Sequence, residues 1–334
     1  MSTVTAARVL APVRRRHPLL AYALRRTAIT VLLLALVSVL IFAATEVLPG
    51  NAAAQILGHS GASAAEKARL SHQLGLDRPL IQQYGSWIGG VLHGDLGESL
   101  ASHQPVSSFI SARLGNSIVL ALAAVLVMIP LSVVLGTVAG IRRGRGIDHT
   151  ISGVSLGLIA LPEFVSGSIL AVVFGVSLAW FPPTSIIPSG SGPLSNPKLL
   201  VLPVLTLCIA GSAYIIRMLR AGVAEAMASD YVQAARLNGI PEPRVVTRHA
   251  LRNSLGPTVQ VVALTVQWLV GGIVVVETVF SYPGLGQGLV QAVTARDIPV
   301  VQSLTLLIAA FYLMVNLVAD IVVILLVPKL RTAL

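Results

Sequence analysis

The sequence contains few charged residues. Asp, Glu, Lys and Arg together make up 11% of its 334 residues, whereas a soluble domain carries about 25%. Hydrophobic residues account for 55%, and the mean hydropathy is +0.84. Too few charges are available to cover a water-facing surface of this size, so the composition excludes an ordinary soluble protein. It also excludes a disordered chain, which requires low hydrophobicity and high charge.

Cysteine and the common catalytic motifs are also lacking. Cys208 is the single cysteine, which excludes an intrachain disulfide and a metal site built from several thiolates. No His is followed by Glu and no Gly precedes a Lys, so the sequence has neither an HExxH zinc motif nor a Walker A loop. Gly284, Gly286 and Gly288 do not have the spacing of a dinucleotide-binding loop. We therefore expect no catalytic residues, no metal site and no cofactor bound by this chain.

Long apolar stretches are abundant. Each can supply the helix of about 20 residues that crosses a bilayer, and helices are expected because backbone polar groups in lipid must be satisfied internally. The first stretch has a 19-residue uncharged run, which is longer than the apolar region of a signal peptide, so we expect a retained helix. We predict an all-α membrane protein with six transmembrane helices, at residues 27–48, 116–141, 151–181, 199–216, 257–276 and 301–327.

The basic residues are distributed unevenly among the connecting segments. Seventeen of the 23 Lys and Arg lie in the leader 1–26, in 142–145, in 217–256 and in the tail 328–334, and six lie in the alternate loops. Cytoplasmic loops carry the excess of Lys and Arg, so we place both termini in the cytoplasm. The net charge of +10 then reports orientation in a lipid bilayer, and we expect no nucleic-acid partner.

The inner segment 217–256 contains two short helical patterns separated by a break. Ser229 or Asp230 suits the N-cap of the first, and Gly239 supplies its C-terminal stop. The second pattern, at about 243–253, carries a stripe of arginines. A basic face that contacts lipid headgroups and a docking element for a partner protein are both compatible with this pattern. The arginines of the stripe are Arg244, Arg248 and Arg252.

The first of these patterns resembles the EAA loop of bacterial ABC importer permeases. The family pattern is Glu-Ala-Ala, three residues and Gly; here Gln233 stands in place of the Glu, and Ala234, Ala235 and Gly239 match. The resemblance covers nearly the whole chain and is closest to the B-type dipeptide and oligopeptide permeases of the peptide/nickel branch. It implies a type I, MetI-like architecture. The permease core would be residues 116–330, and 49–115 would form a large extracytoplasmic segment.

The resemblance also implies roles for two groups of residues. The inner loop would insert into a groove of an ATPase subunit, using Asp230, Tyr231, Gln233, Ala234, Ala235, Gly239, Arg248, His249 and Asn253. The outer segments, including the loop 277–300 with a short helix after Gly284, would form an external gate that receives substrate from a binding protein. Its candidate residues are Asp77, Arg78, Asp95, Glu98, Glu277, Tyr282, Pro283, Arg296 and Asp297.

A third group consists of polar residues inside the predicted spans. Charged side chains at membrane depth are rare and are functional candidates, although polar residues also hydrogen-bond between helices. Pro162 is expected to break the third helix and open a local cavity next to Glu163, whose carboxylate would suit a free peptide amine. The candidates for the pathway are Glu163, Gln260, Gln267, Tyr312, Asn316 and Asp320.

Together these features predict one permease subunit of an ATP-driven importer of di- and oligopeptides. Six helices would form half of the pathway. The implied partners are a second homologous permease, an extracytoplasmic substrate-binding protein, and two ATPase subunits or one fused ATPase that bind ATP and Mg. A nickel, glutathione or haem importer on the same scaffold and a proton-coupled carrier or channel are the alternatives. The chain would have no ATPase site of its own and would lie in the cell membrane of a bacterium, with a high-GC genome indicated by its three Lys.

Overall fold

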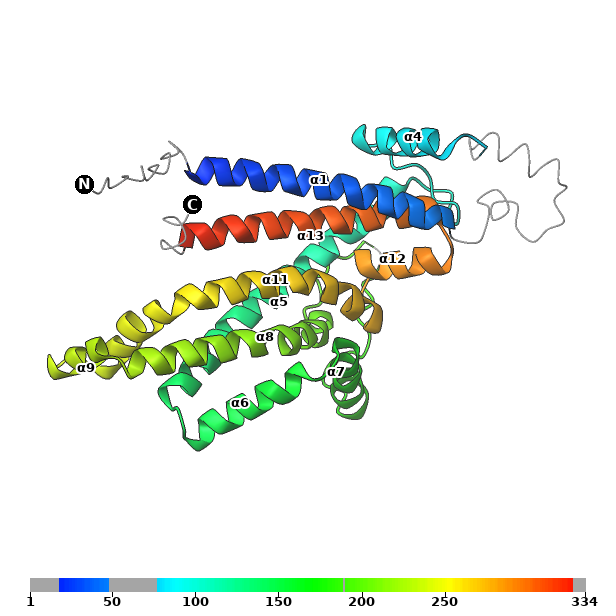
Figure 1. Ribbon diagram of the computed structural model, residues 1–334. Helices are drawn as coiled ribbons and strands as arrows, with labels where there is room; N and C mark the ends of the chain where they lie inside the picture. The colour runs from blue at the N-terminus through cyan, green and yellow to red at the C-terminus, as the bar shows by residue number, and fades with distance from the viewer. Residues whose placement is uncertain (1–17, 48–76, 189, 327–334) are drawn as a thin grey trace, which may run out of the picture.

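The computed structural model describes residues 18–47, 77–188 and 190–326, and this part of the chain is helical (Figure 1). Its one extended pairing is an isolated bridge between Glu98 and Pro105, so the predicted all-α fold is confirmed. Residues 1–17 of the leader, residues 48–76, residue 189 and the tail from 327 lie outside the described residues. The elements are α1 (Pro18–Val47), α4 (Leu80–Leu92), α5 (Val106–Ile141), α6 (Gly146–Ile159), α7 (Glu163–Leu170), η1 (Ala171–Ser177), α8 (Lys198–Met227), α9 (Asp230–Leu237), α10 (Glu242–Arg244), η2 (Val245–Leu251), α11 (Arg252–Val279), α12 (Leu285–Thr294) and α13 (Ile298–Leu326).

Five of the described helical segments are long and apolar enough to cross a membrane, and a sixth crossing is possible if one bent pair counts as a span. The bent pair is α6 followed by α7 and η1, with an angle of 109° between its halves. The break falls at Pro162, which has no N–H for a helical hydrogen bond and keeps the preceding residue out of the α region. The expected single helix 151–181 is therefore two helices that meet at a sharp bend.

The helices extend beyond the apolar ranges that predicted them. Helix α5 begins at Val106 rather than near residue 116, and α8 continues to Met227 rather than ending near 216. The inner segment 217–256 is accordingly mostly helix, because η2 runs directly into α11. Hydropathy reports where a helix is surrounded by lipid, whereas helix ends are set by capping residues such as Pro105 before α5.

Helix α8 forms the centre of the fold. It packs mainly against α5 and α11. In its most apolar stretch, 78% of the residues are buried. Close contact with α5 depends on a small residue, because a Cβ added at Gly140 would lie 2.7 Å from the Cβ of Val223. The main core contains Leu120, Met128, Leu207, Ile215, Leu269, Val276, Phe280 and Tyr282.

Helix α1 packs along α13 in the antiparallel direction (Figure 1). Near the start of α1, Arg26 forms a 2.5 Å ion pair with Asp320. Near its end, Thr45 accepts a 2.8 Å hydrogen bond from Gln302. The beginning of α1, the end of α13 and α9 therefore lie at one end of the molecule, and α12 lies toward the other (Figure 1).

Candidate functional site

The inner segment forms a compact helical elbow at the end of α8. Helix α9 ends in a turn in which the N–H of Ile240 donates to the carbonyl of Ala235 at 3.2 Å and that of Gly239 donates to Arg236 at 2.9 Å. This pair of bonds is the Schellman motif, which requires a left-handed residue after the helix. Gly239 supplies it with φ +74°. The predicted glycine stop of this helix is confirmed.

A small apolar cluster holds the elbow together. Val232 and Ala235 of α9 pack against Val245 of η2. On the surface, the Arg236 guanidinium and the Glu242 carboxylate form an ion pair at 2.6 Å. Helix α9 is thus fixed to η2 and, through it, to α11.

Most of the predicted docking residues lie on the outside of this elbow. Ala235 is buried and His249 is half-buried, whereas the others are exposed: Asp230, Tyr231, Gln233, Ala234, Gly239, Arg248 and Asn253. Since Gln233 is exposed, the Gln in place of the family's Glu does not disturb the buried contacts of α9. Sequence reasoning missed Leu237, an apolar side chain that is 89% exposed at the tip of α9. The signal was an apolar residue directly before the Asn-Gly stop.

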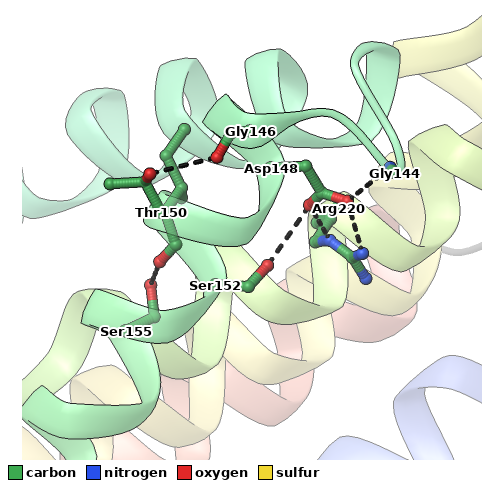
Figure 2. Close-up of polar contacts among 8 residues, drawn as sticks. Gly144, Gly146, Asp148, Thr150, Ser152, Ser155 and Arg220 are labelled. Carbon is green, nitrogen blue, oxygen red and sulfur yellow. Dashed lines mark hydrogen bonds and ion pairs between the residues drawn. The ribbon is translucent and has the colours of Figure 1, made fainter.

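A buried ion pair joins α6 to α8 near the elbow (Figure 2). The Arg220 guanidinium binds both oxygens of Asp148, through Nε to Oδ1 and through Nη2 to Oδ2 at 2.7 Å. The N–H of Gly144 and the hydroxyl of Ser152 also donate to this carboxylate, at 2.9 and 3.2 Å. The Asp148 side chain is 1% exposed, and its full set of donors lets a charge remain inside. The pair therefore fixes the start of α6 to α8.

At the other end of the molecule, Glu277 anchors the start of α12. Its carboxylate accepts hydrogen bonds from the Ser117 hydroxyl at 2.6 Å and from the N–H groups of Gly286 and Gln287 at 2.7 and 3.3 Å. Ser117 in turn accepts from the N–H of Leu285 at 2.8 Å. An anion at this position satisfies the free N–H groups of a helix start and the positive end of its dipole. Helices α5, α11 and α12 thus meet at one carboxylate.

The three spaced glycines after Pro283 permit this junction. An ideal Cβ at Gly284 would overlap the Glu277 carboxylate, and one at Gly286 would overlap Val274 of α11. At Gly288 a Cβ would lie 2.8 Å from Cδ of Arg113 on α5. The pattern that looks superficially like a nucleotide loop is therefore a packing surface for α12.

A second anchor ties the start of α13 to the loop after α4. Asp297 is 3% exposed and accepts hydrogen bonds from the Ser99 hydroxyl and from the N–H groups of Leu100 and Ala101, at 3.1 and 3.3 Å for the two amides. Ser99 and Asp297, although 198 residues apart in the sequence, therefore meet in space.

The predicted gate residues separate into surface and interior groups. Asp77, Arg78, Asp95, Glu98 and Arg296 are exposed and can face a partner. Pro283 is half-buried and its carbonyl accepts a 2.8 Å bond from Asn116. Glu277, Tyr282 and Asp297 are buried, so in this structure they cannot contact a binding protein directly. Each of these three side chains forms hydrogen bonds within the chain, and these bonds hold the surrounding loops in place.

The pathway candidates do not gather at one place. Glu163 lines a cavity of about 650 Å³ together with Tyr214 of α8 and Trp268 of α11, so the break and cavity expected at Pro162 are confirmed. Gln260 and Gln267 are on α11 but outside this lining. Tyr312, Asn316 and Asp320 lie on α13, where Asp320 pairs with Arg26 of α1. Glu163 is thus the one carboxylate of this group that faces open space.

Comparisons with known proteins identify the relatives of this chain. Residues 132–332 match the family described as binding-protein-dependent transport system inner membrane component, and residues 19–123 match its N-terminal family. A Brucella abortus protein named as a peptide transport system permease is 36% identical over 92% of this chain and 98% of its own length. The di/tripeptide permease of Pseudomonas aeruginosa is 35% identical over 88% and 94%, and the dipeptide permease of Escherichia coli is 33% identical over 94% and 99%.

The matched family covers more than half of the chain and includes α6 to α13, the elbow and the carboxylates of the two anchors, Glu277 and Asp297. The chain is therefore a member of the family of binding-protein-dependent transport system inner membrane components, the permease subunits of ABC importers.

Proposed function

We propose that this chain is a permease subunit of an ATP-driven importer of di- and oligopeptides. The observation that carries the proposal is the elbow formed by α9 and η2, an exposed docking surface built on the central helix α8. The peptide substrate is supported by relatives that are named as peptide, dipeptide and di/tripeptide permeases over nearly their whole lengths.

The proposed complex has a defined orientation and a defined set of partners. Both termini and the elbow face the cytoplasm, where two ATPase subunits, or one fused ATPase, bind ATP and Mg. The segment 49–115 and helix α12 face outward, where a substrate-binding protein docks. A second, homologous permease completes the pathway as a heterodimer. The excess of basic residues in the inner segments and the common position of α9 and the start of α1 support this orientation.

The geometry suggests how ATP binding moves the pathway. Closure of the ATPase pair displaces α9, and the apolar cluster of the elbow carries the displacement to η2 and α11. Helix α8 moves with them, and the Asp148–Arg220 pair carries α6 along. The chain supplies a lever and a surface for substrate, and the hydrolysis takes place on the partner subunits.

Co-purification and uptake test this proposal. The tagged chain should bring down an ATPase and a second permease, and the complex in proteoliposomes should import trialanine only with ATP and binding protein. Leu237→Asp should reduce uptake about tenfold or more, because it places a charge in a buried interface. Leu194→Asp is the matched control, since Leu194 is also exposed, at 66%, but lies in the loop before α8. Uptake that follows a proton gradient without ATP would contradict the proposal, and uptake of Ni²⁺, glutathione or haem in place of trialanine would reassign its substrate.

A further inference from the structure

Two cavities meet along one face of α8. The first, of about 650 Å³, contains Glu163 and Trp268. The second, of about 590 Å³, contains Arg217 of α8 and parts of α6. Tyr214 and Val261 line both, so the two cavities form one groove, which we call the α8 trough. It is bounded by α6, α8 and α11.

The outer part of the trough presents a carboxylate that has no partner. Within the described residues, the Glu163 carboxylate forms no hydrogen bond and no ion pair, and the side chain is half-buried. It lies against α11 where a Cβ added at Gly272 would be only 2.9 Å from its oxygens. The backbone of α11 is therefore shaped to hold this carboxylate at the cavity wall, facing space that a ligand could fill.

The part of the trough nearer α9 presents a cation. Arg217 is exposed and, within the same described residues, forms no ion pair, unlike Arg220 one turn further on. Ala210, which lines the Glu163 cavity, and Arg217 are on the same helix. With a rise of about 1.5 Å per residue, they are separated by about 10 Å along α8. An extended peptide spans about 3.3–3.6 Å per residue, so the trough is long enough along α8 to hold a short peptide.

The wall between the two charges is apolar and aromatic. Tyr214 and Trp268 are about half exposed, at 54% and 49%, and Leu264 and Val261 complete the wall. Such a surface accepts different side chains without selecting among them. Moving a charged end group out of water costs free energy unless the group meets an opposite charge. A peptide in the trough therefore needs an opposite charge at each of its two ends, whereas its middle part needs none.

We infer that the α8 trough is a transit site for zwitterionic peptides, in which Glu163 receives the terminal ammonium group and Arg217 receives the terminal carboxylate. The inference rests on the proposed function and adds to it the end groups that are recognised and the direction of travel. Because Arg217 lies nearer to the elbow than Glu163 does, peptides pass with the carboxyl end toward α9. A single charge contact at each end holds the peptide and still allows it to leave, as transport requires.

The test compares three probes in the complete reconstituted transporter. The probes are trialanine, an N-capped trialanine and trialanine amide, with caps chosen among those that the binding protein binds, each at a saturating concentration. Glu163→Gln should reduce uptake of trialanine and of its amide about tenfold and leave the N-capped peptide unchanged, because a charge-assisted hydrogen bond is lost only where an ammonium is present. Arg217→Gln should reduce trialanine and the N-capped peptide and leave the amide unchanged.

Matched variants control for charge removal elsewhere. Glu225→Gln changes an exposed carboxylate further along α8, and Arg143→Gln changes an exposed arginine in the turn before α6. Neither should alter the ratio between free and capped peptides. Yield of the assembled complex and its stimulation by binding protein report folding. If Glu163→Gln does not assemble, Glu163→Asp should assemble and keep the preference for the free amine, and the Arg217 comparison is independent of both.

Two outcomes overturn the inference while leaving the proposed function intact. In the first, the wild-type complex imports trialanine, but Glu163→Gln reduces uptake of all three probes by the same factor. The other is a loss in Arg217→Gln that is as large for the amide as for trialanine, which would indicate a contact with lipid headgroups or a structural role. A wild-type complex that imports none of the probes with ATP would instead contradict the proposed function.

Discussion

Three buried carboxylates, Asp148, Glu277 and Asp297, each accept a hydrogen bond from at least one backbone N–H group. Each also binds a side chain from a distant part of the chain: Arg220, Ser117 and Ser99 respectively. Sequence reasoning named Glu277 and Asp297 only through family likeness, and it gave Asp148 no role. The pairs could not be found from the sequence, because their partners are 72 to 198 residues away and no local pattern connects them.

At this scale, Gly239→Ala should weaken the elbow. The backbone at Gly239 has φ +74°, and a Cβ there meets no atom within 4 Å, so the cost is conformational strain of about 1–2 kcal/mol. The expected result is reduced co-purification of the ATPase and a lower thermal midpoint of the purified complex. Gly271→Ala on α11, also in open space, is the control; because Ala suits a helix interior better than Gly, it should not lower the thermal midpoint. Equal behaviour of the two variants would contradict the role given to the turn.

Asp148 provides a second prediction about single residues. Asp148→Asn should destabilise the protein by about 3 kcal/mol, the lower end expected for breaking a buried pair, because Arg220 retains 31% exposure of its side chain. Adding Arg220→Met should recover part of the loss, since no charge then remains unpaired. Thermal unfolding in detergent of the wild type, Asp148→Asn, Arg220→Met and the double variant gives the coupling energy between the two side chains. Strict additivity of the two substitutions would show that the ion pair does not join α6 to α8.

At the scale of elements, the sequence predicted the type and position of the long helices but missed some of their ends. The apolar runs located the long helices, and Pro162 located the break. The start of α5 and the end of α8 were missed because both helices continue beyond their most apolar part. The Glu163 cavity was expected from the break, whereas Arg217 was counted only as a cytoplasmic charge, because the cavity that it lines with Val261 of α11 depends on how α8 packs.

Helix α12 carries a prediction of its own. Glu277→Leu removes the acceptor for two N–H groups at its start, and loss of such a cap costs about 0.5–2 kcal/mol. Amide hydrogen exchange in residues 285–294 should accelerate about three- to thirtyfold. Glu277→Gln keeps one oxygen acceptor and should show a smaller change. If exchange in α12 stays slow in Glu277→Leu, the helix is held by its apolar contacts and the carboxylate is not its anchor.

At the scale of the whole molecule, the two ends of the structure are built differently. At the end that carries α12, this helix and the loop after α4 are held by the two carboxylate anchors and by an apolar cluster that includes Val106, Leu285 and Leu304. At the end that carries α9, the elbow presents a small cluster and an exposed Leu237. Family likeness predicted which end docks to which partner. The hydrogen bonds and apolar contacts that hold each end are visible only in the packed structure.

The pairing of α1 with α13 has a consequence for biosynthesis. Arg26 reaches the ribosome exit long before Asp320 exists, so the first helix enters the membrane with its guanidinium uncompensated and must keep that group at the headgroup level. The ion pair forms only when the last helix inserts. Docking of α1 therefore waits for α13, and a chain that lacks α13 would leave Arg26 without the carboxylate that it meets in the folded protein.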